Sequence, residues 1–211
     1  MSEIKDPELK LEETPIYIIN NIESPSSSDS LRTIVLYGDI TEDRSREVVH
    51  GLLALNQSRK SEIIDEEGNS ETIIKPIKLV VSTYGGSAQD MFAMYDLMNL
   101  VKQDCEIETA ALGKVMSAGV LLLANGTKGS RRIGKNCRVM IHNVMGIHNG
   151  TLPSLENEIK ETRIVQERYF EELISCTKLT KSKLKKLLNG NVDAYLSAEE
   201  AIKYGIADEL I

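Results

Sequence analysis

The chain has 211 residues, of which 41% are hydrophobic and 27% are charged, and its formal net charge at pH 7 is −7. This length and composition are typical of a water-soluble globular protein with one substantial core. The negative charge gives no electrostatic basis for binding nucleic acid or an anionic membrane surface, so we expect neither as a partner.

The sequence also argues against membrane and secreted classes. No apolar stretch reaches the roughly 20 residues that a membrane-spanning helix needs, and the acidic start MSEIKDPELKLEETP lacks a signal-type apolar core. The three cysteines, Cys105, Cys137 and Cys176, are widely spaced, which favours neither a disulfide framework nor a zinc site. We therefore expect a cytoplasmic protein without a metal ion.

The first third of the chain predicts an arm followed by a strand and a helix. Residues 1–30 are acidic and end in the serine-rich ESPSSSDS, so we interpret them as a partly flexible N-terminal arm before a domain over 31–211. The β-branched run of 31–40 predicts a strand. Residues 41–57 predict a helix capped by Thr41, because apolar residues follow at helical spacing.

Strands and helices continue to alternate through the middle of the chain. The charged segment 58–71 lacks periodicity and predicts an exposed loop. Residues 74–86 then predict a strand ending in a glycine pair, and 87–103 an amphipathic helix. A strand over 105–113 leads into the apolar helix of GKVMSAGVLLLANG. This alternation favours an α/β fold with a largely parallel sheet.

The last third contains the longest helical pattern. Residues 130–143 predict extended structure, and 154–179 a long helix with a broad apolar stripe beside a charged face. Two short helices follow over 181–190 and 197–205, each ending in a glycine at the C-cap position. No internal repeat is present.

A candidate nucleophile lies where the third predicted strand meets its helix. In open α/β sheets, ligands bind beyond the carboxyl ends of the strands, where helix N-termini present unpaired N–H groups. Ser117 occupies such a position, next to the N–H of Ala118, and the glycine pair Gly85-Gly86 could bring a second N–H close. Two such donors form an oxyanion hole. A serine that begins a helix is more often only its cap, so both interpretations stay open here.

A serine nucleophile needs a base, and the chain has three histidines. His50 lies on the first predicted helix and His148 in a loop, whereas His142 closes the apolar strand CRVMIH. The end of a strand is a rigid position at the same sheet edge as the helix N-termini. His142 is therefore the best candidate base, although a structural role is common for a histidine at such a place.

Two other motifs do not support a function. GSRRIGKN resembles a phosphate-binding loop, but it ends in Asn136 instead of a hydroxyl residue and precedes an extended run instead of a helix. Cys137 and His142 are five residues apart in one predicted strand, so their side chains point in opposite directions. Nucleotide binding and cysteine catalysis are both disfavoured.

Several blocks together resemble the ClpP family of self-compartmentalising serine peptidases. They are VVSTYGGSAQDMFAMYDLMNLVKQD, LGKVMSAGVLLLANGTKGSRRIGKNCRVMIHN and DAYLSAEEAIKYGIADELI, and the resemblance covers residues 32–211. It implies that Ser117 is the nucleophile, that His142 is the general base, and that Asp193 in DAYLSA is the third member of a catalytic triad. The assignment of Asp193 rests on the resemblance alone.

The resemblance also assigns the positions that hold substrate. It implies that the oxyanion donors are the backbone N–H groups of Gly86 and Ala118. Substrate binding falls on Gly85, Ser87 and Asn143. The family performs endopeptidase chemistry through an acyl-enzyme without a cofactor of its own. ATP is used only through a partner.

The fold and partners implied by the resemblance follow. The fold is the ClpP/crotonase-like α/β superhelix of β-β-α units, with a protruding handle, a strand plus a long helix, over about residues 143–178. Family members form two stacked heptameric rings, a tetradecamer, whose chamber cleaves unfolded polypeptides to short peptides. A separate ring-shaped AAA+ unfoldase feeds that chamber.

The chain departs from the family pattern at several places. Tyr84 replaces the usual proline before the glycine pair, and Asn143-Val144 replaces a segment that normally contains proline, so a different cleavage preference is expected. Asn191 and Val192 replace charged residues that link ring stacking to the active site. The first 30 residues do not match the family's axial loop. The insertion over 58–75 is expected on the outer surface.

Two alternatives from other classes remain. One is a catalytically silent ring component, against which the intact Ser117, His142 and Asp193 argue. The other is an acyl-CoA enzyme of the crotonase type, which shares the fold and its pair of N–H donors. Such an enzyme does not need a Ser–His–Asp set.

Overall fold

The structure is a computed structural model that describes residues 31–64, 69–189 and 192–211. The N-terminal arm predicted over residues 1–30 lies outside the described residues. Arg32–Ile211 form one unit, which contains every helix and strand named below.

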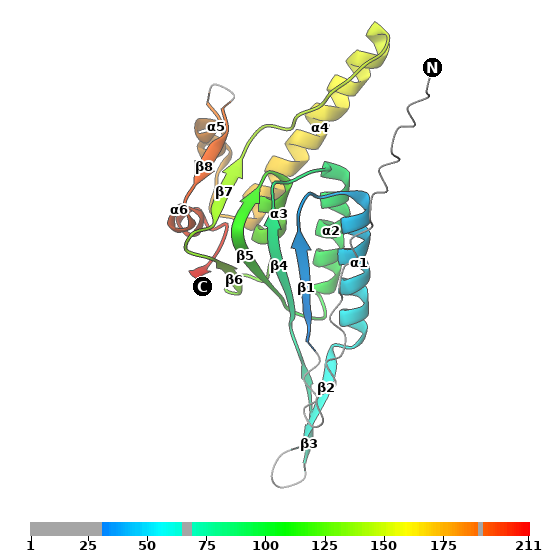
Figure 1. Cartoon of the computed structure of the whole chain (residues 1–211), viewed down its shortest axis with the longest axis vertical. Coiled ribbons are helices and arrows are strands. Elements are labelled where there is room, and N and C mark those ends of the chain that lie inside the picture. Colours follow the sequence, from blue (N-terminus) through cyan, green and yellow to red (C-terminus); the bar gives the residue numbers. More distant parts are fainter. Residues whose placement is uncertain (1–30, 65–68, 190–191) are drawn as a thin grey trace, which may run out of the picture. The chain divides into compact units, whose positions relative to one another are not determined.

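The first half of this unit repeats strand-to-helix passages, as the sequence predicts (Figure 1). In the main sheet the strands of this half pair in parallel, β1 with β4 and β4 with β5. Local signals explain the helix starts, since the side chains of Thr41 and Ser87 accept the capping bonds of α1 and α2. The elements are β1 (Thr33–Tyr37), α1 (Glu42–Gln57), β4 (Ile77–Thr83), α2 (Ala88–Val101), β5 (Ile107–Met116) and α3 (Ala118–Ala124).

The second half completes the sheet and adds the longest helix. Its elements are β6 (Arg131–Ile133), β7 (Arg138–Ile141), α4 (Leu152–Cys176), α5 (Lys181–Leu187), β8 (Ala194–Leu196), α6 (Ala198–Lys203) and β9 (Glu209–Leu210). The strand order is β1-β4-β5-β6-β9, and β7 pairs with both β5 and β8. Within this sheet only the β7–β8 pair of the described chain is antiparallel. The predicted α/β fold with a largely parallel sheet is confirmed.

Strand β5 changes partner along its length, and this brings two chain segments together. Its residues Thr109–Ala111 pair with β6, whereas Lys114–Met116 pair with β7. Gly113 lies between these stretches with a φ of +68°, which glycine adopts without steric cost. Because Met116 lies opposite Met140, the residues after β5 and after β7 emerge at the same place.

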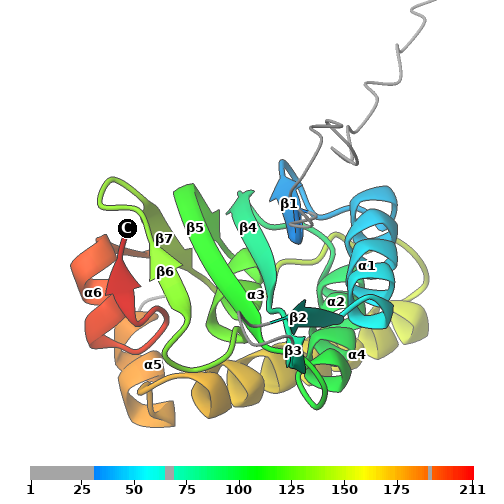
Figure 2. The same ribbon diagram turned by 90° about the horizontal axis from the view of Figure 1, so that it is seen from below.

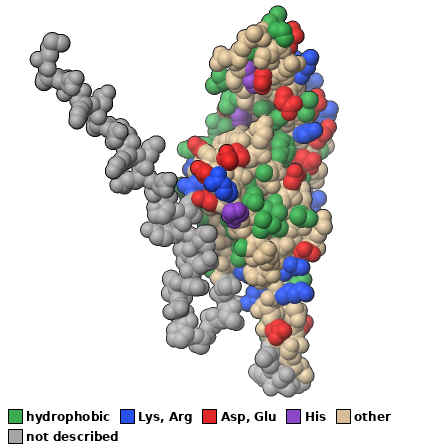
Figure 3. All heavy atoms as spheres, turned by 90° about the vertical axis from the view of Figure 1, so that its right-hand side faces the viewer, with side chains coloured by type: hydrophobic (Ala, Val, Ile, Leu, Met, Phe, Trp, Pro, Cys, Tyr) green, Lys and Arg blue, Asp and Glu red, His purple; other side chains and the backbone are tan. Residues whose placement is uncertain are grey.

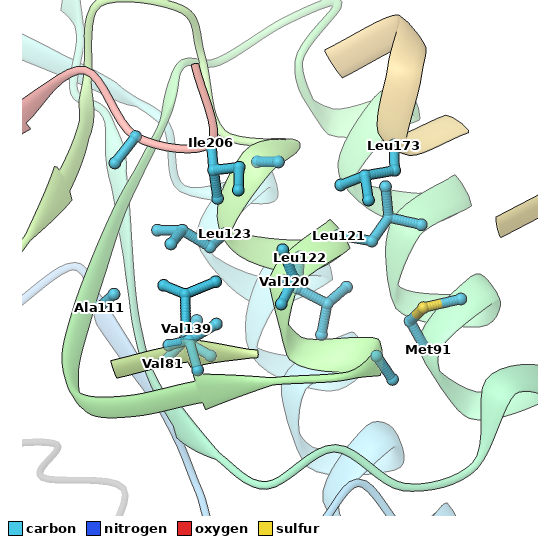
Figure 4. Close-up of a cluster of buried hydrophobic side chains, with 14 of the residues drawn as sticks. Val81, Met91, Ala111, Val120, Leu121, Leu122, Leu123, Val139, Leu173 and Ile206 are labelled. Carbon is cyan, nitrogen blue, oxygen red and sulfur yellow. The ribbon is translucent and has the colours of Figure 1, made fainter. Parts of the chain in front are cut away.

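The core lies between the sheet and its helices. All seven residues of α3 are buried. Figure 4 shows its residues Val120–Leu123 packed among Val81, Val139, Met91 and Leu173, which come from strands and helices far apart in sequence, and near Ile206 from the turn after α6. This packing fixes the N-terminus of α3 against β5.

The helices α1 to α4 gather on one side of the sheet (Figure 2), and among the described residues no helix covers the opposite side of β1, β4 and β5. Exposed fractions alternate accordingly along β1, where Leu36 is 1% exposed but Val35 is 58% and Tyr37 is 65% exposed. Such one-sided burial is typical of a sheet face that packs on helices.

One element was missed by the sequence analysis. Residues 58–71 were predicted as a loop, but β2 (Lys60–Ile64) and β3 (Ser70–Ile74) pair as antiparallel strands. This prediction was wrong because the two strands are largely exposed, so no burial imposes the apolar alternation by which a strand is recognised. β-branched residues such as Ile63 and Thr72 favour the strand locally.

The long helix α4 has 25 residues, of which only Tyr169 and Leu173 are buried. Its N-terminal half extends beyond the sheet (Figure 1). The handle implied by the resemblance also contains a strand, but residues 142–150 have no β-pairing within the described chain. A strand needs a hydrogen-bonding partner, and this segment finds none there.

Candidate active site

Ser117 has an unusual backbone conformation between β5 and α3. Its φ is +53° and its ψ is −125°, and it is the sole non-glycine residue with a positive φ in the part of the chain that the structure describes. A side chain in this region carries strain, which persists where the surroundings enforce it. The hydroxyl makes no capping bond to α3. The helix-cap interpretation is therefore not realised, and the hydroxyl is free to act elsewhere.

The hydroxyl of Ser117 faces the imidazole of His142, with Ser117 Oγ and His142 Nε2 2.6 Å apart. Strand register explains the meeting, because Met116 pairs with Met140 and the Ser117 N–H donates to the Met140 carbonyl at 2.8 Å. A hydroxyl within hydrogen-bonding distance of an imidazole is the arrangement that a base-activated nucleophile requires.

The other two histidines lie elsewhere. His50 is exposed on α1. His148 lies in the cavity wall but is held against α4, with Nε2 3.1 Å from Thr162 Oγ1 and Nδ1 3.5 Å from Glu158. The structure thus brings His142 to Ser117 and leaves His50 and His148 out of contact with it.

Asp193 lies just before β8 and borders the same cavity as Ser117 and His142. Its side chain is exposed, and among the hydrogen bonds of the described residues none joins it to His142. The described structure thus contains a Ser–His pair with a carboxylate at the rim. The role of Asp193 as the third triad member stays a prediction.

The glycine pair lies where two backbones approach closely. Gly85 and Gly86 have φ values of +107° and +150°. Gly86 forms a parallel bridge with Ile40, in which the Ile40 N–H donates to the Gly85 carbonyl at 2.8 Å and the Ser87 N–H donates to the Ile40 carbonyl at 3.0 Å. A Cβ on Gly86 would lie 2.2 Å from the Ile40 oxygen, and one on Gly85 2.6 Å from Ser117 Cβ. Both positions therefore require glycine.

Two backbone donors at this site are not used by the described protein groups. The N–H of Gly86 and the N–H of Ala118 have no acceptor among the hydrogen bonds of the described residues. Ala118 is the first residue of α3, where helical geometry leaves N–H groups unpaired. Gly86, Ala118 and Ser117 line one cavity of about 540 Å³. This is the composition of an oxyanion hole, and its role stays a prediction.

The cavity also contains the other groups expected to hold substrate. Its lining includes Tyr84, Ser87 and His142, together with apolar side chains such as Met145 and Val165. Asn143 borders a neighbouring cavity of about 610 Å³, which shares His142 and Asp193 with the first. Gly85 is among the lining residues of neither cavity and packs against the side chain of Ser117. These sizes suit a short stretch of peptide or a small ligand.

One residue at the site was missed by the sequence analysis. The hydroxyl of Tyr169, on α4, donates to the Ser117 carbonyl at 3.0 Å. Burial raises the pKa of Tyr169 well above its ordinary value, so the hydroxyl stays protonated. Periodicity identified Tyr169 only as part of an apolar stripe, and no local signal could reveal a contact across 52 residues.

The structure explains why neither Cys137 nor the GSRRIGKN segment has the function its sequence suggests. Burial raises the pKa of the Cys137 thiol to about 11, so it is protonated and unreactive near neutral pH. In GSRRIGKN, Arg131 is in β6, and its guanidinium bonds Asp208. No group of three or more potential ligand side chains in the described ranges is arranged to hold a metal. None of the helices described is long and apolar enough to cross a membrane.

The fold and the cavity define an α/β protein with a serine–imidazole pair at the N-terminus of a buried helix, beside a close-packed glycine pair. The family model of Clp protease matches residues 21–211 of this sequence, so the chain belongs to the Clp protease family. Membership confirms the resemblance seen in the sequence and implies a ClpP-type peptidase, which is a hydrolase.

Proposed function

We propose that this chain is a serine endopeptidase that cleaves unfolded polypeptides to short peptides, with Ser117, His142 and Asp193 as its catalytic triad. The observation that carries the proposal is the 2.6 Å contact between Ser117 Oγ and His142 Nε2, made by a serine with a φ of +53°. A structural serine at a helix start has no need of that strained backbone or of an imidazole partner.

The proposed mechanism follows from the positions of these groups. His142 accepts the proton of Ser117 as the oxygen attacks a peptide carbonyl, and the N–H groups of Gly86 and Ala118 stabilise the resulting oxyanion. The imidazolium then donates its proton to the leaving amine. Water, activated by the same histidine, releases the acyl-enzyme and restores Ser117. Asp193 orients the imidazole through Nδ1, which requires its carboxylate to move from the exposed rim to His142.

We further propose that the chain assembles with copies of itself into two stacked heptameric rings, and that a separate AAA+ unfoldase supplies it with substrate. Exposed apolar side chains support assembly. Met145, Ile147 and Leu152 are 81%, 96% and 70% exposed near the free end of α4, where apolar groups are visible at the top of Figure 3. The three cysteines are unpaired, which agrees with a reducing compartment such as the cytosol.

Two alternatives to an active peptidase, an acyl-CoA enzyme and a catalytically silent ring component, fit the site less well. A crotonase-type acyl-CoA enzyme does not need a serine bonded to an imidazole, and family membership favours the peptidase. A silent ring component has no reason to retain the strained Ser117.

Labelling with a fluorophosphonate tests the nucleophile. The wild-type chain is expected to be labelled, and Ser117→Ala is expected to abolish the label with little loss of stability, because the hydroxyl makes no capping bond. The label is detected by in-gel fluorescence and assigned by peptide mass mapping.

Ser197→Ala is the matched control. Ser197 also lies between a strand and a helix, but its side chain accepts a capping bond from the Glu200 N–H at 3.2 Å. We expect this variant to retain the label and to lose about 1 kcal/mol of stability. Labelling that survives in Ser117→Ala would overturn the assignment of the nucleophile.

A further inference from the structure

We propose that Tyr169 is a positioning residue that orients the oxyanion donor at Ala118, so that α4 acts directly on the catalytic geometry. This role rests on the proposed peptidase function. The Tyr169 hydroxyl donates to the carbonyl oxygen of Ser117 at 3.0 Å. Helix α4 lines the cavity but supplies none of the residues in the proposed triad or oxyanion hole, so this contact links α4 directly to them.

A single peptide unit joins the Tyr169 contact to the proposed oxyanion donor. The carbonyl of Ser117 and the N–H of Ala118 belong to the same planar group and point in opposite directions. A bond that holds the oxygen therefore fixes the direction of the N–H. The Tyr169 hydroxyl bonds the carbonyl end of this unit, and Ala118, which carries its N–H, lines the cavity together with Tyr169.

Two backbone hydrogen bonds also hold Ser117, and Tyr169 adds a third bond from another helix. The Ser117 N–H is fixed by the Met140 carbonyl at 2.8 Å, and the Ser117 carbonyl also accepts from the Val120 N–H at 3.0 Å. Between these two anchors the residue has a positive φ, which a residue with a side chain leaves when it is not held. The bond from the Tyr169 hydroxyl to the Ser117 carbonyl opposes this relaxation.

The Tyr169 hydroxyl is held in place and stays protonated, so it can act as a constant hydrogen-bond donor. The Tyr169 side chain is 5% exposed, and burial keeps the phenol protonated. One helical turn later, Leu173 points toward Leu121 of α3 (Figure 4). Tyr169 and Leu173 thus contact α3 at Ser117 and Leu121, two positions with the same spacing of four residues, which holds the helices in register.

The test compares Tyr169→Phe with Tyr95→Phe. Both changes remove only a hydroxyl. Tyr95 is a matched control because it is 6% exposed and its hydroxyl also bonds α4, at Glu172, away from the cavity. Activity is measured on a fluorogenic peptide, stability by thermal unfolding, and backbone protection by hydrogen exchange of peptides covering residues 113–126.

For Tyr169→Phe we expect kcat to fall about 10-fold with KM within about twofold, because the affected donor acts on the transition state. We also expect faster exchange of the Ser117 and Val120 amides, and a melting temperature close to that of Tyr95→Phe. Tyr95→Phe is expected to keep the wild-type kcat and exchange.

Three results would overturn the proposal: a wild-type kcat in Tyr169→Phe, equal losses of kcat in both variants, or unchanged exchange across residues 113–126. Exchange does not depend on activity, so it decides the positioning role even if the wild-type chain hydrolyses no peptide. Absence of hydrolysis and of fluorophosphonate labelling in the wild-type chain would instead contradict the proposed function.

Discussion

Single residues set the geometry of the candidate site through backbone contacts more than through side-chain chemistry. Ser117 adopts its positive φ where Gly85 leaves no Cβ in its way, since a methyl group there would lie 2.6 Å from Ser117 Cβ. Gly86 is equally restricted, because a methyl group there would collide with the Ile40 carbonyl. Gly86→Ala is therefore a poor test of the proposed oxyanion donor. A loss of activity in that variant would report displaced backbone as well as a lost N–H.

A partly buried ion pair makes stability depend on pH. The Arg131 guanidinium is 4% exposed and donates two hydrogen bonds to the Asp208 carboxylate, at 2.6 and 2.9 Å. These bonds are the main reason why the pKa of the Asp208 carboxyl is below its ordinary value of 3.8. A lowered pKa in the folded state means stability that is present above about pH 4 and lost as pH falls through the folded value. We expect Asp208→Asn to cost about 1–3 kcal/mol at pH 7, because Arg131 loses its partner while Asp208 is only partly buried, and to flatten the acid dependence.

Urea unfolding followed by circular dichroism at pH 7, 5 and 3 measures both effects. Asp104→Asn is the control, because Asp104 lies 3.8 Å from Arg59 and is half exposed, so this pair contributes at most about 1 kcal/mol. Parallel pH profiles for the wild type and Asp208→Asn would contradict the role assigned to Asp208.

At the scale of elements, α3 packs on β4 with almost no space between them. A Cβ on Gly119 would lie 2.3 Å from Thr83 Cγ2, whereas its next contacts would be at ordinary distances. The fit thus depends on one methyl group of Thr83. The hydroxyl of the same side chain accepts from the Gly85 N–H at 2.9 Å, so Thr83 supports the glycine pair as well as the helix.

A double-mutant cycle tests this fit. Gly119→Ala is expected to destabilise the chain by about 1–3 kcal/mol through overpacking. Thr83→Ser removes the opposing methyl group but retains the hydroxyl bond, so the double variant should be less destabilised than the sum of the single variants by about 1 kcal/mol or more. Urea unfolding measures each free energy.

Gly51→Ala combined with Thr83→Ser is the control for that cycle. The nearest atoms to a Cβ on Gly51 would be side-chain atoms of Ile34, far from Thr83 in the sequence and outside α3, so the two effects should add. Strict additivity of Gly119→Ala and Thr83→Ser would show that α3 and β4 do not depend on this contact.

The sequence predicted those elements whose burial imposes a periodic pattern. Strands β1, β4 and β5 and helices α1 to α4 were identified for this reason, and Ser117 and His142 followed from their positions at strand ends. The β2–β3 hairpin was missed because it is largely exposed. Tyr169 was missed because its contact joins distant segments, and Asp193 came from the family resemblance alone. The φ of Ser117 also has no signature in the local sequence.

On the scale of the whole molecule, much apolar surface is left uncovered by the described chain. The uncovered face of the sheet exposes Val35 and Tyr37, and α4 exposes Leu152 and Ile159, which are 70% and 48% exposed. Leu152 and Ile159 are seven residues apart and so lie on one side of α4. A lone chain gains nothing from this surface, which favours the proposed self-assembly.

Replacing Leu152 and Ile159 on that side of α4 by charged residues should therefore impair assembly. We expect native mass spectrometry to give multiples of seven chains for the wild type and smaller species for the Leu152→Glu/Ile159→Glu variant. The melting temperature of the separated chain should change little, because neither side chain is buried.

Ile74→Glu is the control for assembly, since Ile74 is 54% exposed on β3, outside α4. We expect it to assemble as the wild type does. A monomeric wild type, or unchanged assembly of the double α4 variant, would contradict the proposed interface.

The β2–β3 pairing has a consequence for a chain that cleaves other chains. Peptidases accept substrate as an extended strand whose backbone groups bond the cleft. Residues from Lys60 to Ile64 and from Ser70 to Ile74 already bond each other, so they must separate before either stretch can enter a neighbour's active site. The pairing therefore leaves neither strand in the single extended form that a peptidase cleft binds.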